Sequence, residues 1–278
     1  MTSFVAWVGV DSRGPASLYL ASDSCVSWGA AATWDCGRKL FASKNHPDLL
    51  GYVGDVLFPS LALSQVTAAI DADALYPQGS RADERFSLIR ETVRSTFDKL
   101  PPCGRHHFTV VYATREHEGM RSRFHIWVLA WRAAAGWAER DISIPTTSSS
   151  LWISGSGVQS IHEWQARWNS SSQGRTSRAV FGAFCDAIHS RSDPLTGGAP
   201  QLVGLYRTGP ARTIGVVFGG KPHLFGLPLP RYAEAQALAL EWRNALFERC
   251  DAMGNPLPAA QKHHAPRGLA KSHPKDPG

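Results

Sequence analysis

The chain has 278 residues, 43% of them hydrophobic, and a formal net charge of +6. That length and apolar fraction are sufficient for the core of one sizeable domain. The sequence contains neither a run of about 18 apolar residues nor a secretory leader, and its basic residues are spread out rather than gathered on one helix. We therefore expect no membrane span, no export and no nucleic-acid partner.

The first segment predicts a β-hairpin. Residues 2–10 have the pattern of a buried or half-buried strand, residues 11–15 that of a turn, and residues 16–22 that of a second strand. This hairpin would place Asp23 at the end of its second strand. Two glycine-containing segments follow, at 35–41 and 50–56.

Periodicity over the rest of the chain predicts mixed α and β structure. Apolar residues have helical spacing at 55–70, 82–100, 158–167, 176–190 and 231–250, and strand patterns occur at 107–113, 124–131, 137–144, 201–207 and 213–218. Residues 251–278 are rich in proline, lysine and histidine and too poor in apolar residues to fold alone, so we predict a disordered tail. The folded domain is accordingly expected at residues 1–250.

The cysteines indicate a reducing compartment. They are scattered, odd in number and form no Cys-x-x-Cys pair, which suits reduced thiols better than a disulfide framework. A cytoplasmic location is therefore expected. The sequence has no His-Glu-x-x-His motif, no Cys/His cluster and no calcium-binding loop, so no metal or other cofactor is expected. The five cysteines are Cys25, Cys36, Cys103, Cys185 and Cys250.

Thr2 follows the initiator Met1, which is normally removed before a residue as small as threonine. A free N-terminal threonine carries a hydroxyl nucleophile and an amine whose ordinary pKa is about 7.7–8.0, so part of that amine is neutral and can act as a base. One residue then supplies both groups. Threonine is common after an initiator methionine, so this interpretation depends on the residues that follow.

Five short segments follow Thr2 in order: Ala-Ser-Asp-Ser at 21–24, Gly-Arg-Lys-Leu-Phe at 37–41, Gly-Tyr-Val-Gly-Asp-Val at 51–56, Gly-Ser-Gly at 155–157 and Asp-Pro-Leu-Thr-Gly-Gly at 193–198. With the threonine-led strand, they resemble segments of proteasome β-type subunits and their bacterial relatives, which are N-terminal-nucleophile (Ntn) hydrolases. The resemblance spans residues 2–220. It implies a four-layer αββα sandwich within the α+β class.

By this resemblance, Thr2, Lys39 and Asp23 form the reactive group. Lys39 would be the cation that favours the alkoxide of Thr2, and Asp23 would be the counter-charge that holds Lys39 in place. The backbone N–H of Gly51 would donate to the oxyanion, a position that suits glycine because the backbone must approach the substrate closely. Without Thr2, the Asp23–Lys39 pair would be interpreted as a surface ion pair worth about 0–1 kcal/mol.

The resemblance also implies that Ser156, Asp193 and Thr196 surround the α-amine of Thr2 and orient it. Each has a structural alternative, because Ser156 could cap a helix and Asp193 could belong to a turn. The chain departs from the family pattern at two positions. Thr196 stands where the family usually has serine, which keeps the hydroxyl, and Cys25 stands where arginine is frequent, which weakens the electrostatic part of the comparison.

The resemblance further assigns Gly37, Leu49 and Val53 to the pocket for the substrate side chain that precedes the cleaved bond. None of the three is charged. A charged side chain buried among them would be unpaired, at a cost of several kcal/mol. We therefore expect an apolar side chain in this pocket.

The function implied is that of a threonine peptidase, which cleaves peptide bonds through an acyl-enzyme after removal of Met1 alone. The substrates would be peptides or unfolded proteins, the protein would form a ring of identical subunits, and an unfoldase ATPase is a candidate partner. Two alternatives stay open. One is a related amidase acting on a small amide, and the other is a non-catalytic ring subunit that keeps the fold for assembly.

Overall fold

The computed structural model describes residues 2–29, 32–230 and 240–258. Its larger sheet has the strand order β10-β1-β2-β11-β12-β13-β14, and β15 pairs with both β12 and β16. Every neighbouring pair is antiparallel except β12 with β15. The strands are β1 (Ser3–Asp11), β2 (Gly14–Ser22), β10 (Ser149–Gly155), β11 (Gln201–Tyr206), β12 (Arg212–Phe218), β13 (Lys221–Leu224), β14 (Leu227–Pro228), β15 (Glu241–Asn244) and β16 (Arg249–Cys250).

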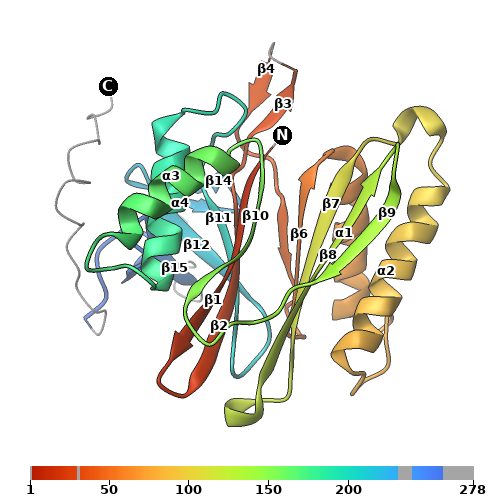
Figure 1. Ribbon diagram of the computed structural model, residues 1–278, viewed down its shortest axis with the longest axis horizontal. Coiled ribbons are helices and arrows are strands. Elements are labelled where there is room, and N and C mark those ends of the chain that lie inside the picture. The colour runs from red at the N-terminus through yellow and green to blue at the C-terminus, as the bar shows by residue number, and fades with distance from the viewer. Residues whose placement is uncertain (1, 30–31, 231–239, 259–278) are drawn as a thin grey trace.

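A second sheet lies beside the first (Figure 1) and is antiparallel throughout, with the order β5-β6-β7-β8-β9. A small hairpin of β3 (Val26–Trp28) and β4 (Ala32–Trp34) projects near the N-terminus. The strands of the second sheet are β5 (Leu40–Ala42), β6 (Asp48–Gly54), β7 (Phe108–Glu116), β8 (Arg123–Arg132) and β9 (Gly136–Asp141).

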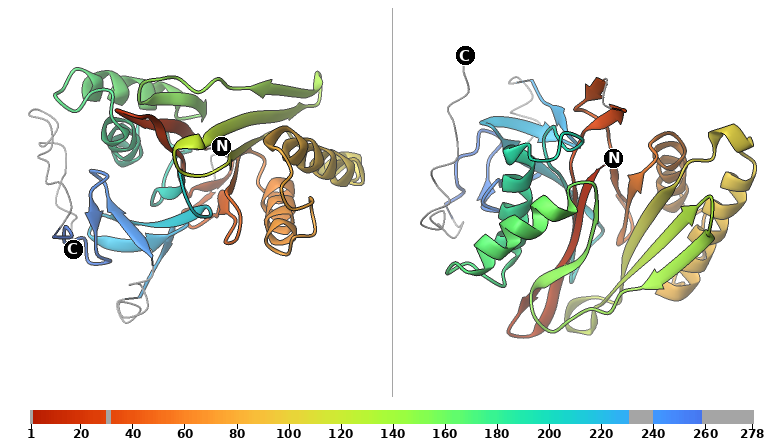
Figure 2. Two further views of the ribbon diagram at one scale, coloured as in Figure 1. Left: turned by 90° about the horizontal axis from the view of Figure 1, so that it is seen from below. Right: turned by 45° about the horizontal axis from the view of Figure 1, so that its top comes forward.

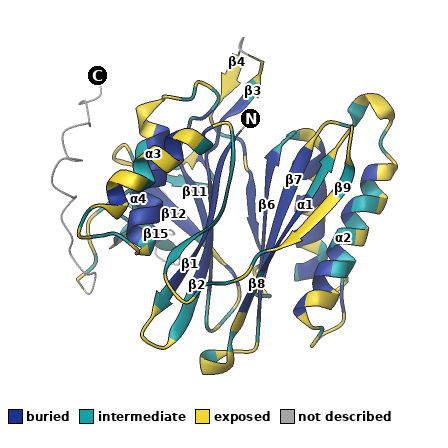
Figure 3. Cartoon of the chain, in the orientation of Figure 1, coloured by how far each residue is buried: buried dark blue, intermediate teal, exposed yellow. Residues whose placement is uncertain are grey.

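Alternation along the strands divides their side chains between separate cores. In β1, Phe4 and Ala6 pack in the core between the two sheets, whereas Val5 and Trp7 point to the opposite face of the larger sheet. Successive strand residues point to opposite faces, and here both faces are covered. Figure 3 accordingly shows the central strands as almost entirely buried.

The helices cover the outer faces of the two sheets (Figures 1 and 2). Helices α3 (Val158–Asn169) and α4 (Ser177–Ser190) pack on the larger sheet, where Ile161 and Phe181 share a core with Trp7. Helices α1 (Leu57–Asp71) and α2 (Ala82–Asp98) pack on the smaller sheet through residues such as Phe58 and Phe97. The predicted α+β class is confirmed, and none of the described helices is long and apolar enough to cross a membrane.

The helices predicted at 55–70, 82–100, 158–167 and 176–190 correspond to α1, α2, α3 and α4, and the predicted strands are also present. The helix predicted at 231–250 is wrong in its second half. Residues 241–244 form β15, which runs parallel to β12, and residues 249–250 form β16. Residues 231–239 lie outside the described ranges. Trp242 is buried with Val217 and Cys250, and this tertiary contact prevails over helical spacing.

The first part of the tail predicted from residue 251 is ordered. Pro256 forms a bridge with Cys250, and the Leu257 N–H donates to the Arg249 carbonyl at 3.1 Å. The Asp251 carboxylate also accepts from the Met253 and Asn255 N–H groups. Residues 251–258 thus extend the edge formed by β15 and β16. The remainder of the predicted tail, residues 259–278, lies outside the described part of the chain.

Replacing Trp242 tests this edge of the larger sheet. Trp242→Ala should lower the free energy of unfolding by ~3–5 kcal/mol, because it empties a buried aromatic site. Trp28 is 61% exposed, so Trp28→Ala serves as a control and should change stability by about 0.5 kcal/mol or less. Urea denaturation measures both, and equal effects of the two substitutions would show that residues 241–244 do not pack as β15.

Candidate active site

The fold gathers residues that are distant in sequence at one edge of the paired sheets. Thr2 precedes β1, Asp23 follows β2 and Lys39 precedes β5, and all three residues are fully buried. The register Phe4↔Ser22 in the β1–β2 hairpin places Ser3 beside Asp23. Their backbones are joined by a hydrogen bond from the Asp23 N–H to the Ser3 carbonyl at 3.1 Å. The register of the hairpin therefore positions Asp23 next to the start of β1.

Lys39 and Asp23 form a buried ion pair with an Nζ–Oδ1 distance of 2.7 Å. The Asp23 carboxylate also accepts backbone N–H groups from Ser3 at 3.0 Å, Cys25 at 3.1 Å and Gly197 at 3.2 Å. Burial raises the pKa of the Asp23 carboxyl, while the Lys39 charge and these hydrogen bonds oppose that rise. The pair is therefore held from several segments, unlike a surface ion pair.

The Thr2 hydroxyl lies at this edge and has no hydrogen-bond partner among the described residues. A buried hydroxyl without a partner costs free energy, and such exceptions call for an explanation. The chain passes close by at Gly155, whose φ is +105° and whose Cβ, if present, would lie 1.6 Å from the Thr2 carbonyl oxygen. Glycine is thus required at 155 by the close approach of β10 to Thr2.

Ser156, Asp193 and Thr196 also come together. The Thr196 hydroxyl donates to Asp193 Oδ2 at 2.7 Å, and the Leu195 N–H donates to Asp193 Oδ1 at 3.0 Å. Burial tends to raise the pKa of the Asp193 carboxyl, but hydrogen bonds from Ser156, Thr196 and Leu195 lower it below its ordinary value. Asp193 is therefore an anion at neutral pH.

Gln201 and Ser3 take part in the site but were not identified from the sequence. The Gln201 side chain accepts from the Lys39 N–H at 3.0 Å and donates to the carbonyls of Asp23 at 3.0 Å and Gly37 at 2.7 Å. It thereby fixes the backbone on both sides of the ion pair. A polar residue at the head of an otherwise apolar strand is the sequence signal for this role.

Cys25 is a thiol close to Asp23, to which its backbone N–H donates at 3.1 Å. It is buried, and burial together with the charges of Asp23 and Asp35 raises the pKa of its thiol to about 11. The thiolate is the reactive form of cysteine. Cys25 is therefore protonated and unreactive at neutral pH.

The structure corrects the expectation for Gly51, which lies in the middle of β6 rather than at the edge. A Cβ at Gly51 would lie 2.7 Å from the Phe4 ring and 2.8 Å from Leu40, so this glycine faces the core. The Tyr52 N–H donates toward β5, to the Lys39 carbonyl at 3.2 Å. Since neighbouring residues of a strand direct their N–H groups to opposite sides, the Gly51 N–H points into the ladder with β7.

The residues predicted for the substrate pocket are also mostly enclosed. Leu49 is fully buried and Val53 nearly so, and both pack in the core between the sheets. Leu49 therefore does not line an open pocket. Gly37 is buried as well, and a Cβ there would lie 2.3 Å from the Val26 side chain.

A cleft of about 600 Å³ adjoins the site. Its lining includes Asp193, Thr196, Gly197, Cys25 and Asp35. It thus lies against the loop that carries the Asp193–Thr196 pair. Among the described residues, no group of three His, Cys, Asp or Glu side chains is arranged as a metal site requires.

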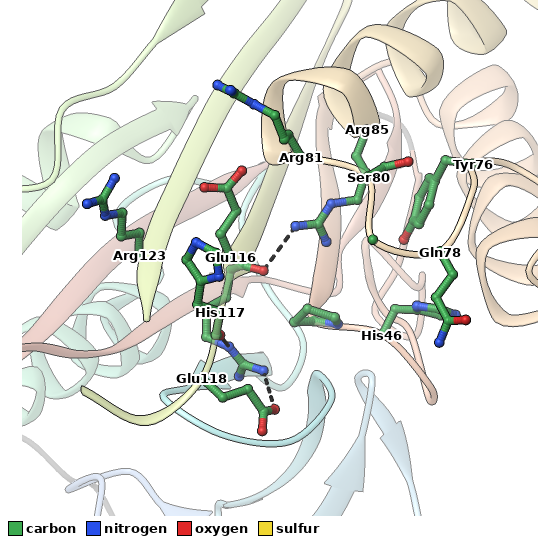
Figure 4. Close-up of a pocket in the computed structure, with 13 residues that line it drawn as sticks. His46, Tyr76, Gln78, Ser80, Arg81, Arg85, Glu116, His117, Glu118 and Arg123 are labelled. Atoms are coloured by element: carbon green, nitrogen blue, oxygen red, sulfur yellow. Dashed lines mark hydrogen bonds and ion pairs between the residues drawn. The ribbon is translucent and has the colours of Figure 1, made fainter. Parts of the chain in front are cut away.

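Figure 4 shows another cleft, of about 640 Å³. It lies at the opposite end of β6, because His46 and Pro47, which precede that strand, line it. Two of its lining hydroxyls already donate hydrogen bonds within the protein: Tyr76 donates to Asp48 at 2.6 Å, and Ser80 donates to the Pro77 carbonyl at 2.7 Å. Its buried Arg85 is held by Asp48 and by the Arg115 carbonyl. The hydroxyls that line this cleft are therefore not activated as nucleophiles.

No protein-family model matches the chain, and no curated protein matches it in sequence. Similar solved structures include Anbu (ancestral beta-subunit) from Yersinia bercovieri, at 13% identity and TM-score 0.48, over 73% of this chain and 81% of that chain. HslV from Trypanosoma brucei has 10% identity and TM-score 0.45, over 73% and 99%. Thiobacillus denitrificans BPH in complex with epoxomicin has 14% identity and TM-score 0.47, over 74% and 100%. These are proteasome-like Ntn hydrolases.

Removing the Lys39 charge should destabilise the folded protein. Lys39→Met leaves the Asp23 carboxylate buried without its cation and should lower the free energy of unfolding by ~3–5 kcal/mol. A buried acid with a raised pKa is protonated in the folded state at low pH and must ionise as pH rises. The loss should therefore be larger at about pH 8 than at about pH 5. Urea denaturation at both pH values measures it.

Lys44→Met is the matched control, because Lys44 is exposed. It should have little effect on stability at either pH. The double variant Asp23→Asn, Lys39→Met should recover part of the loss, since it removes both charges. Equal stabilities of the Lys39 and Lys44 variants would contradict the buried pair.

Proposed function

We propose that the chain is an N-terminal-threonine hydrolase whose nucleophile is Thr2, exposed at the terminus by removal of Met1. The observation that carries this proposal is the fully buried Lys39–Asp23 pair at the start of β1, beside a threonine hydroxyl that has no partner in the described structure. Burial of two charges costs several kcal/mol per ion. Stabilisation of a developing alkoxide on Thr2 by Lys39 explains why the fold bears this cost.

The reaction follows from these groups. The neutral α-amine of Thr2 takes the proton of its own hydroxyl as Oγ attacks the substrate carbonyl, and Lys39 favours the anionic oxygen. Collapse of the tetrahedral intermediate breaks the C–N bond, and the departing amine takes the proton held by the Thr2 ammonium. The product is an acyl-enzyme ester. Water then loses a proton to the α-amine and attacks the ester, and the ester C–O bond breaks as Oγ takes that proton back from the Thr2 ammonium.

Asp193 is proposed to orient the α-amine. Its carboxylate is ionised and is held by the Thr196 hydroxyl and the Leu195 N–H. An anion placed near the amine favours the ammonium form that appears after proton transfer. Ser156, which also bonds to Asp193, belongs to the same group.

For the oxyanion we propose the N–H of Gly54 in place of that of Gly51. Gly54 is the last residue of β6 and has a φ of +103°. It lies two residues after Tyr52, whose N–H points toward Lys39, so strand alternation directs the Gly54 N–H to the same side. Because β5 begins only at Leu40, that side is not covered by a paired strand residue.

The proposed substrates are peptides or unfolded proteins, and the proposed assembly is a cytoplasmic ring of identical subunits that an ATPase could supply with unfolded chains. The two sheets with helices on their outer faces would then be the αββα sandwich expected from the sequence motifs. An amidase acting on a small amide would use the same residues. A non-catalytic ring subunit is less well supported, because it has no need to bury Lys39.

Thr2 is tested by substitution. Thr2→Ala should lower the hydrolysis of fluorogenic peptide amides by about 10³-fold or more, because it removes the nucleophile, and it should leave the fold intact. Thr2→Ser should keep partial activity. The intact mass of the wild-type protein should lack Met1. Unchanged turnover in the Ala variant would exclude this mechanism.

Assembly is tested separately by light scattering at micromolar concentration. A ring of about six or more copies is expected. A monomer would favour the small-amide alternative over the peptidase, because a single open subunit cannot confine access to unfolded chains.

A further inference from the structure

Ser3 is a buried polar residue that joins the two halves of the site. It is 1% exposed and directly follows Thr2. Its N–H donates to Asp23 Oδ1 at 3.0 Å, and its carbonyl accepts from the Asp23 N–H at 3.1 Å. Its hydroxyl lies 2.9 Å from the Thr196 hydroxyl oxygen. One residue thus contacts both the Lys39–Asp23 pair and the Asp193–Thr196 pair.

The direction of the bond between the two hydroxyls can be assigned. A threonine hydroxyl has one proton to donate, and Thr196 donates it to Asp193 Oδ2 at 2.7 Å. Asp193 is ionised and can only accept. The Ser3 hydroxyl must therefore be the donor to Thr196, which gives a chain of two hydrogen bonds running from Ser3 through Thr196 to Asp193.

Gly157 leaves room for this chain. A Cβ at Gly157 would lie 1.9 Å from Ser3 Oγ and 3.0 Å from Thr196 Oγ1. Any larger residue at 157 would displace the Ser3 hydroxyl from Thr196. The Gly-Ser-Gly segment thus contributes Ser156 to Asp193 and, through Gly157, the space in which Ser3 reaches Thr196.

We propose that Ser3 is a positioning residue: its hydroxyl ties the strand that carries the nucleophile to the loop that carries Asp193, and it turns the Thr196 proton toward the Asp193 carboxylate. This role rests on the proposed function, since Asp193 matters here as the group that orients the Thr2 α-amine. Ser3 itself does not contact the reacting atoms. Its effect should appear in kcat and leave KM unchanged.

The hydroxyl can be tested with a pair of variants of equal shape. Ser3→Thr keeps the donor and Ser3→Val removes it, whereas both add the same bulk. We expect kcat of the Thr variant to exceed that of the Val variant by about tenfold, the effect of one hydrogen bond of ordinary strength. The kcat of Ser3→Ala should be lower than that of wild type by a similar factor. Equal kcat values for the Thr and Val variants, or full kcat in Ser3→Ala, would overturn the proposal.

Gly157→Ala tests the same contact without removing a hydroxyl, so its effect on kcat in the wild-type background serves alone if Ser3 variants fold poorly. It should lower kcat about tenfold in the wild-type background and by much less in Ser3→Ala, because the two residues share one contact. Additive losses would overturn the proposal.

Thr2→Ala measures the background hydrolysis that does not depend on Thr2. If wild type shows no Thr2-dependent turnover, the proposed function fails. If wild type is active but Ser3→Ala equals it, only the role of Ser3 fails.

Discussion

The buried ion pair between Lys39 and Asp23 constrains the rest of this edge of the molecule. Both side chains are fully buried, so their attraction offsets the loss of hydration only while the geometry is held closely. Backbone N–H groups from Ser3, Cys25 and Gly197 supply that restraint, and Gln201 fixes the chain on both sides. The start of β1, the end of β2 and the loop before β11 are therefore tied to one carboxylate. A shift of any of them would weaken the pair.

Two carboxylates at this edge are suited to different tasks because their surroundings differ. Asp23 faces a cation, and burial raises its pKa while Lys39 opposes that rise, so it acts as the counter-ion. Asp193 faces hydrogen-bond donors, which hold its pKa below the ordinary value and keep it anionic. Different environments can suit one carboxylate in a site to proton transfer and another to electrostatic stabilisation. The Thr2 hydroxyl, which has no partner in the described structure, lies at the same edge.

Much of this arrangement could be predicted from local sequence. Alternation in residues 2–22 predicts the hairpin that brings Asp23 to Ser3, and apolar spacing predicts the four described α-helices. The parts that failed depend on tertiary context. Residues 241–250 have helical spacing but form strands because Trp242 packs on the larger sheet. Gly51 and Gly54 look alike in sequence, and only the strand register shows which of them reaches the edge. Ser3 could not be recognised, because its partner Thr196 is 193 positions away.

The most direct measurement is reaction with a peptide epoxyketone followed by mass spectrometry of the intact protein and its N-terminal peptide. This class of inhibitor forms a ring with both the hydroxyl and the free amine of an N-terminal nucleophile, so it reports on both groups of Thr2 in one product. We expect one adduct per chain, located on Thr2 of a protein that lacks Met1 and absent from Thr2→Ala. A protein that keeps Met1, or one that forms no adduct at Thr2 under conditions that modify a known N-terminal-threonine hydrolase, would contradict the assignment of Thr2 as the nucleophile.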